Sequence, residues 1–131
     1  MIIFSNVSKI YDNGTKALDN ISFFIERGEF VFIVGPSGSG KSTLIKLLMH
    51  EETATSGDVI INSVNVNALK QSQIPYLRRN MGVVFQDFRL LPKKTVYENV
   101  SFAMEIVGAS RREIRRQVPN VLSMVGLSHK A

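Results

Sequence analysis

Gly35-Pro36-Ser37-Gly38-Ser39-Gly40-Lys41-Ser42 is the stretch that decides the fold class of this chain. It matches the pattern G-x-x-x-x-G-K-[ST], in which glycines let consecutive backbone N–H groups converge on bound phosphates. Fixed residues of these types match by chance in about one chain in 250 of this length. The pattern therefore predicts a phosphate-binding loop, although a glycine-rich turn that binds nothing is the plain alternative.

The residues on either side of the loop have the character that a phosphate-binding loop requires. Residues 29–34 read Glu-Phe-Val-Phe-Ile-Val, which is typical of a strand buried on both faces of a mostly parallel sheet. Residues 41–50 carry leucine and isoleucine at helical spacing, so a helix is expected from Lys41 onward. Its positive end would face the phosphates, with Lys41 neutralising the β and γ phosphates and the Ser42 hydroxyl coordinating Mg²⁺.

Short strands are expected on both sides of the loop. Their residues alternate apolar and polar side chains, or are rich in β-branched and aromatic residues. The expected strands are residues 2–8, 21–26, 59–61, 64–66 and 81–85. Asn13-Gly14 is a turn signal between the first two, so these two strands are expected to pair antiparallel.

The second half of the chain has a largely helical pattern. Helices are expected at residues 74–80 and 95–108 from the spacing of their apolar residues. A further helix begins after Ser110, an N-cap residue whose capping box is completed by Glu113. Pro119 is expected to kink or split that helix.

Composition limits the classes of protein to consider. The chain has 131 residues, 44% of them hydrophobic and 21% charged, which is the range of ordinary globular domains. The absence of cysteine excludes a disulfide framework and a thiolate metal site. The net charge is +5, and an arginine cluster lies at Arg111, Arg112, Arg115 and Arg116. Charge runs on helices are usually solvated faces, so no nucleic-acid partner is expected.

The amino-terminal residues 1–10 fit neither a signal peptide nor a membrane-spanning helix. Polar residues interrupt the apolar stretch too often for either. Any membrane association is therefore expected to come through a partner.

Three features outside the loop resemble the ABC ATPase family. They are Tyr11 ahead of the loop, Ser56-Gly57 after the loop helix, and Val84-Phe85-Gln86 further along the chain. The resemblance covers essentially the whole chain. It implies an α/β fold with a P-loop NTPase core, an antiparallel β subdomain and the start of a helical subdomain, incomplete relative to the family. The implied division of this one ATP-binding domain is 1–87 for the β subdomain and core, and 88–131 for the rest.

The resemblance also implies roles for single residues, with ATP and Mg²⁺ as the ligands. Tyr11 would stack on the adenine, and Gln86 would reach Mg²⁺ or the attacking water. Lys41 and Gln86 are the implied catalytic residues, and Ser42 and Gln86 the implied metal ligands. The implied nucleotide-binding residues are Tyr11, Gly35, Pro36, Ser37, Gly38, Ser39, Gly40, Lys41, Ser42 and Thr43. A tyrosine packed at a hairpin end and a glutamine on the polar surface remain the alternatives.

Residues 85–100 narrow the resemblance to a bacterial cell-division branch of the family, although ATPases of lipoprotein-release and macrolide-efflux systems share the loop and the glutamine. The implied partner is a polytopic membrane protein subunit, and the implied assembly is a homodimer of ATPase subunits in the complete protein. The implied location is cytoplasmic and peripheral, on the inner face of the plasma membrane. Residues 87–108 would contact the partner through Phe88, Leu90 and Leu91, unless these three pack beneath the next helix.

Several family elements are not found in the sequence: an LSGGQ-like signature, a strand ending in Asp-Glu, and a later switch histidine. Without a general base and transition-state donors, positioning alone gives little rate. We therefore expect this chain to bind nucleotide without hydrolysing it efficiently unaided. The open alternatives are an interaction module with a regulatory nucleotide site, a DNA-repair or chromosome ATPase suggested by the arginine cluster, and a P-loop kinase.

Overall fold

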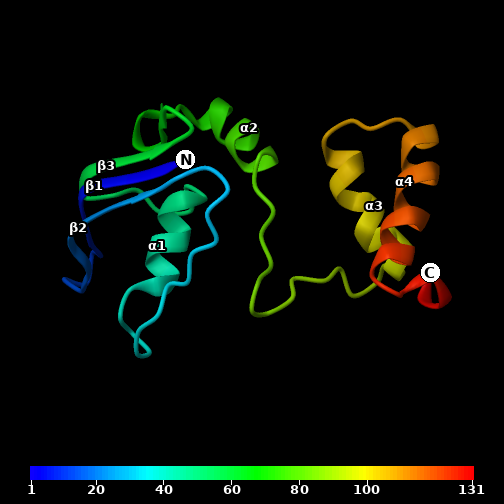
Figure 1. Cartoon of the computed structure of the whole chain (residues 1–131), viewed down its shortest axis with the longest axis horizontal. Helices are drawn as coiled ribbons and strands as arrows, with labels where there is room; N and C mark the ends of the chain where they lie inside the picture. Colours follow the sequence, from blue (N-terminus) through cyan, green and yellow to red (C-terminus); the bar gives the residue numbers. More distant parts are fainter. The chain divides into compact units, whose positions relative to one another are not determined.

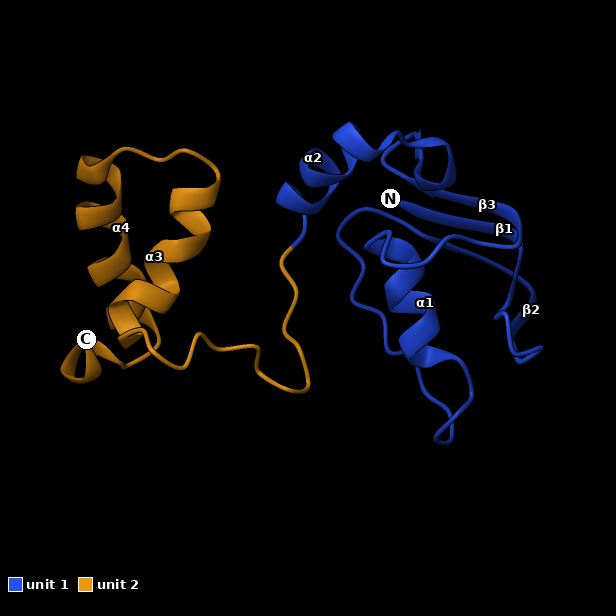
Figure 2. Ribbon diagram, turned by 180° about the vertical axis from the view of Figure 1, so that it is seen from behind, with its two compact units in different colours: residues 1–81 blue, residues 82–131 orange.

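A computed structural model describes the whole chain, residues 1–131. The chain forms two compact units, residues 1–81 and residues 82–131, which Figure 2 shows in different colours. Each unit has a hydrophobic core of its own. None of the helices combines the length and the apolar character that crossing a bilayer requires. The expected subdomain boundary at residue 87 stays a prediction.

The first unit is built on a four-stranded antiparallel sheet with the strand order β2-β1-β3-β4 (Figure 1). The strands are β1 (Ile2–Ile10), β2 (Lys16–Ile25), β3 (Ser56–Ile61) and β4 (Val64–Asn65). Phe4 in β1 lies opposite Phe23 in β2 and Val59 in β3, so β1 is the central partner. The predicted antiparallel pairing of the first two strands is confirmed.

One helix, α1 (Lys41–Leu48), packs against this sheet. Leu44 and Leu47 lie three positions apart and therefore share one face of the helix. The cluster that they complete is buried and consists of Phe4, Val7, Leu18, Leu44, Leu47, Val59 and Val66. This packing fixes the helix whose first turn follows the glycine-rich loop.

A short helix, α2 (Ile74–Arg79), follows the sheet and agrees with the predicted helix at residues 74–80. Arg78 of α2 donates from Nε to the Met49 carbonyl at 2.9 Å and from Nη2 to the His50 carbonyl at 3.3 Å. These carbonyls lie just after α1, where the negative end of the helix dipole favours a cation. Two 3-10 turns precede α2, η1 (Val66–Ala68) and η2 (Gln71–Gln73).

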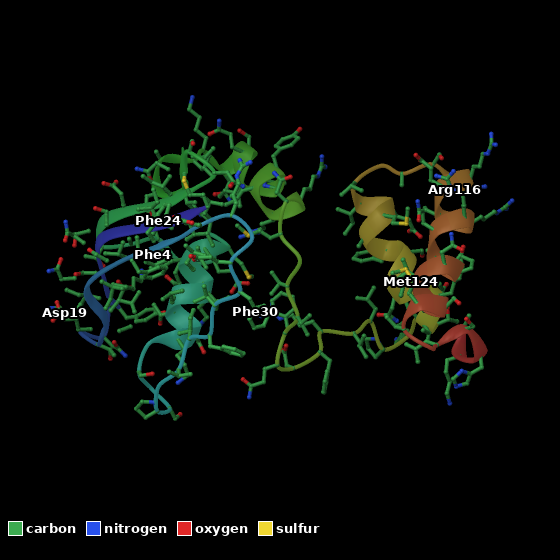
Figure 3. All side chains as sticks on the ribbon, viewed as in Figure 1. Phe4, Asp19, Phe24, Phe30, Arg116 and Met124 are labelled. Carbon is green, nitrogen blue, oxygen red and sulfur yellow. The ribbon has the colours of Figure 1, made fainter.

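Residues 29–34 and 81–85 are not strands in the structure, and this contradicts the prediction from their apolar sequence. Phe30, labelled in Figure 3, is 85% exposed and Val84 is 99% exposed. A strand needs backbone hydrogen bonds from a neighbouring strand, and neither segment pairs with another in this chain. Both segments therefore have the apolar composition of a buried strand, but no neighbouring strand pairs with them.

The second unit is a pair of helices, α3 (Val96–Ile106) and α4 (Arg111–Met124), followed by the 3-10 turn η3 (Ser128–Lys130). Both helices begin where the sequence predicts. Thr95 with Glu98 forms a complete capping box at α3, and Ser110 with Glu113 forms one at α4.

Helix α4 packs on α3 through Ile114, Val118 and Leu122, which are all buried. The sequence predicted a kink or a split at Pro119, and the helix is not split there. Val118 and Leu122 stand on either side of the proline and anchor both halves of the helix in the same core, which offsets the missing N–H group.

Candidate functional site

The glycine-rich loop ends at Gly40, which is the N-cap of α1 and has a φ of 97°. A Cβ atom at this position would lie 2.4 Å from the carbonyl oxygen of Ala17 in β2. A Cβ atom at Gly35 would lie 2.6 Å from the Ser39 Oγ. Gly40 is therefore required by its positive φ and by the close backbone of Ala17, whereas a Cβ atom at Gly35 would displace the Ser39 side chain.

Lys41 folds back over this loop. Its ammonium group donates to the carbonyl oxygens of Gly35 at 2.5 Å and Pro36 at 2.7 Å, and lies 3.2 Å from the Ser39 Oγ. The positive charge therefore lies at the loop. Its acceptors are two carbonyl oxygens and one hydroxyl oxygen, which the oxygens of an anionic ligand could replace. Charge-assisted hydrogen bonds to phosphate are stronger than these bonds to neutral carbonyls.

The first turn of α1 adds a second source of positive potential. Gly40 supplies no side chain to cap the helix, and the first turn has no acidic residue. The N–H groups at the start of the helix and the positive end of its dipole therefore favour an anion at the loop. Ser42 is exposed in this turn, so its hydroxyl is open to a ligand.

Thr43 and Tyr11 are brought together by the fold, although 32 positions separate them. The Tyr11 Oη lies 3.1 Å from the Thr43 Oγ1, and Thr43 is buried. The two hydroxyls therefore hydrogen-bond to each other, and Thr43 itself lies in the first turn of α1. Tyr11 thus lies against the first turn of α1.

Tyr11 also starts the turn that joins β1 to β2. Its N–H donates to the Thr15 carbonyl at 2.9 Å, and its carbonyl accepts from the Gly14 N–H at 2.8 Å. The backbone of the tyrosine is therefore fixed as well as its hydroxyl, while the residue remains only half-buried.

Gln86, the other predicted site residue outside the loop, is exposed and belongs to the second unit. It precedes two residues with left-handed backbone, Phe88 at φ 61° and Arg89 at φ 46°. The Arg89 guanidinium lies 3.9 Å from the centroid of the Phe85 ring, so this turn is closed by a cation–π contact. The role of Gln86 at the nucleotide stays a prediction.

Sequence reasoning missed Lys9. Its ammonium group lies 5.2 Å from the centroid of the Tyr11 ring and forms an ion pair with Glu52 at 3.1 Å. Strand alternation could not have found its contact with Tyr11, because Tyr11 follows the end of β1. The contact with Glu52 joins distant parts of the chain and has no local signature.

No group of three or more His, Cys, Asp and Glu side chains is placed to hold a metal ion. A Mg²⁺ ion at this loop would depend on phosphate oxygens and water in addition to the Ser42 hydroxyl. That is how Mg²⁺ usually binds at phosphate sites.

Comparison with known proteins gives the family. Residues 18–131 match the family model of the ABC transporter. The cell division ATP-binding protein FtsE of Bacillus subtilis is 52% identical over 131 residues, which is 100% of this chain and 58% of the relative. FtsE of Mycobacterium tuberculosis is 53% identical over 132 residues, with 100% and 57% covered. FtsE of Escherichia coli is 44% identical over 131 residues, with 100% and 59% covered.

Solved structures agree with this result. The ATP-binding cassette MJ0796, in a dimeric post-hydrolysis state bound to ADP and Pi, superposes with a TM-score of 0.85 at 37% identity. The match covers 95% of this chain and 56% of that one. The cbiO1 protein of Clostridium perfringens, part of the ABC transporter complex cbiONQ, also gives 0.85, at 32% identity over 98% of this chain and 51% of its own. The chain thus spans little more than half the length of the proteins it matches, and it belongs to the ABC transporter family.

Proposed function

We propose that this chain is the ATP-binding part of an ABC-type ATPase subunit. In the complete protein, this subunit couples ATP binding and hydrolysis to a membrane partner in bacterial cell division. The observation that carries the proposal is the position of the Lys41 ammonium, at 2.5 Å and 2.7 Å from two loop carbonyls. The FtsE relatives support the process, since they cover the whole chain at 44% to 53% identity.

The loop geometry supports the proposed roles of the loop residues at the nucleotide, and the family resemblance supports those of Tyr11 and Gln86. The N–H groups of the loop and of the first turn of α1 bind the phosphates, and Lys41 neutralises the β and γ phosphates. Tyr11 stacks on the adenine from the β1–β2 turn. When bound, Mg²⁺ neutralises phosphate charge, with Ser42 and Gln86 as its proposed protein ligands.

The start of the loop helix supports a phosphate ligand electrostatically. No acidic residue lies in the first turn of α1 to repel an anion, and Gly40 leaves the start of the helix without a side-chain cap. Hydrolysis also requires a base that activates water and donors that stabilise the transition state. We assign those groups to the rest of the complete protein and to a second ATPase subunit in a homodimer.

The proposed membrane partner is an FtsX-like polytopic subunit, which places the ATPase at the cytoplasmic face of the plasma membrane. Phe88 is 78% exposed and Leu90 is 69% exposed, so these two side chains do not pack beneath α3. Leu91 is partly buried, and its N–H donates to the Asn99 Oδ1 at 2.8 Å. Exposed aromatic and leucine side chains on a loop favour contact with a partner. No nucleic-acid partner is proposed.

Replacement of Lys41 tests ATP binding. Lys41→Ala removes the ammonium from the loop, and charge-assisted hydrogen bonds contribute about 1.5 to 3 kcal/mol each. The affinity for Mg²⁺-ATP in isothermal titration calorimetry is expected to fall at least about tenfold. Lys46→Ala, which removes an exposed lysine from the same helix, is the matched control and is expected to bind like the parent chain. Unchanged ATP binding by Lys41→Ala would refute the proposal.

A further inference from the structure

We infer that Lys9 is a positioning residue for the nucleotide base: it holds the Tyr11 ring in the orientation in which the ring stacks on adenine. The inference rests on the proposed ATP site and extends it to a residue outside the loop. It is carried by the contacts of the Lys9 ammonium group, which are all made with residues of the first unit.

The side chain of Lys9 is held in one place. It is only 12% exposed, and its ammonium group forms an ion pair with Glu52 at 3.1 Å and donates to the Thr53 carbonyl at 2.9 Å. A largely buried ammonium group is stable only where it is paired and hydrogen-bonded, and both conditions are met. The position of the Lys9 ammonium group is therefore restrained by two contacts.

The same ammonium group lies against the ring of Tyr11. Its distance of 5.2 Å from the ring centroid is within the range of a cation–π interaction. The Tyr11 hydroxyl is held by Thr43, and the Tyr11 backbone by the turn to Thr15. The ring is thus restrained at its hydroxyl, at its backbone and at the ring itself before any ligand arrives.

These restraints connect the ring to the phosphate site. Thr43 lies in the first turn of α1, whereas Glu52 and Thr53 follow the end of α1. Tyr11 is therefore linked to both ends of the helix that begins at the phosphate loop, directly through Thr43 and indirectly through Lys9. A ring placed in this way binds the base without first losing side-chain freedom, which is the advantage of preorganisation.

A purely structural role for Lys9 makes a different prediction. An ion pair that only stabilised the fold would affect every ligand of the loop alike, because it would act through the amount of folded protein. A residue that positions Tyr11 affects only ligands that carry a base. Tripolyphosphate has the phosphate chain of ATP without the base, so it separates the two roles.

The experiment is isothermal titration calorimetry of the intact chain with Mg²⁺-ATP and, separately, with Mg²⁺-tripolyphosphate. Lys9→Met keeps most of the side-chain stem and removes the charge. It is expected to weaken ATP binding about threefold to tenfold, which is the range of a partly desolvated cation–π contact, and to leave tripolyphosphate binding unchanged. Lys9→Arg keeps the cation and is expected to bind ATP like the parent chain. Lys46→Met, the matched loss of an exposed lysine, is expected to change neither ligand.

A double-mutant cycle with Tyr11→Ala completes the test. Tyr11→Ala is expected to weaken ATP binding about tenfold through lost base stacking, and Lys9→Met is expected to add nothing in that background, because the two residues act as a unit. Equal losses for ATP and tripolyphosphate in Lys9→Met, or additive losses in the double variant, overturn the inference.

The remaining outcomes separate this inference from the proposed function. If Tyr11→Ala weakens ATP binding and Lys9→Met does not, the inference alone is overturned and the proposed function stands. If Tyr11→Ala binds ATP like the parent chain, the stacking role is wrong and the inference falls with it. If the parent chain binds neither ligand, the proposed function itself is overturned.

Discussion

Gly40 is the residue at which the phosphate loop has the least freedom. Its φ of 97° is a conformation that side chains rarely adopt, and a Cβ atom would also lie 2.4 Å from the Ala17 carbonyl oxygen. Gly14 has a similar φ of 86° in the β1–β2 turn, but a Cβ atom there would meet nothing within 4 Å. The two glycines therefore share the backbone requirement and differ in the space around them.

Gly40→Ala is consequently expected to destabilise the protein more than Gly14→Ala. The left-handed backbone costs each alanine variant about 1 to 2 kcal/mol, and the collision with Ala17 adds to this at position 40 alone. Urea unfolding of the two variants measures the difference between their free energies of unfolding. Equal destabilisation would show that the loop has more room around Gly40 than the structure indicates.

Single residues of the candidate site differ in whether the sequence predicts their position. The pattern predicted that Lys41 and Gly40 lie at the loop, because the glycine spacing and the helix signal are local. The bond between Tyr11 and Thr43 and the contact of Lys9 with Glu52 were not predicted. Both join residues more than 30 positions apart, so they depend on how β1 packs beside α1 rather than on any short motif.

The capping carboxylates at the starts of α3 and α4 make the stability of these helices depend on pH. Hydrogen bonds from the Thr95 backbone and then from its hydroxyl hold the pKa of Glu98 below its ordinary value of 4.5. The Ser110 hydroxyl and then its backbone N–H hold the pKa of Glu113 below the same value. Carboxylates with a lowered pKa in the folded state contribute stability above their unfolded pKa, and this stability is lost as the pH falls through the folded pKa.

The second unit is therefore expected to lose thermal stability as the pH falls below about 4.5. The double variant Glu98→Gln, Glu113→Gln keeps side chains that can cap the helices and has no carboxylate to protonate in either capping box. Its melting temperature, followed by circular dichroism at 222 nm, is expected to depend less on pH in this range than that of the parent chain. An identical pH dependence in both proteins would show that the capping carboxylates do not contribute.

Elements differ in how far the sequence predicts them. The starts of α3 and α4 were predicted correctly, because Thr95 with Glu98 and Ser110 with Glu113 act within one turn of the helix. Residues 29–34 were predicted wrongly as a strand, because strand formation depends on a neighbour that the sequence pattern does not supply. Helix α4 was predicted to kink or split at Pro119 and is not split, since its packing on α3 outweighs the local effect of proline.

At the scale of the whole molecule, the nucleotide loop and the proposed partner contacts belong to different units. The loop and Tyr11 lie in the first unit, whereas Gln86, Phe88 and Leu90 lie in the second. Each unit has its own hydrophobic core. Gln86, which we propose as a ligand of Mg²⁺ at the nucleotide, is the residue of the second unit through which ATP binding would be sensed there.

Titration of the intact, isotopically labelled chain with Mg²⁺-ATP, followed by NMR of its backbone amides, tests most directly whether the glycine-rich loop encloses a triphosphate. We expect saturable shifts concentrated at the amides of residues 38–42, and their loss in Lys41→Ala at the same ATP concentrations. Unchanged loop amides, or saturable shifts confined to other parts of the chain, would show that the loop does not enclose the nucleotide.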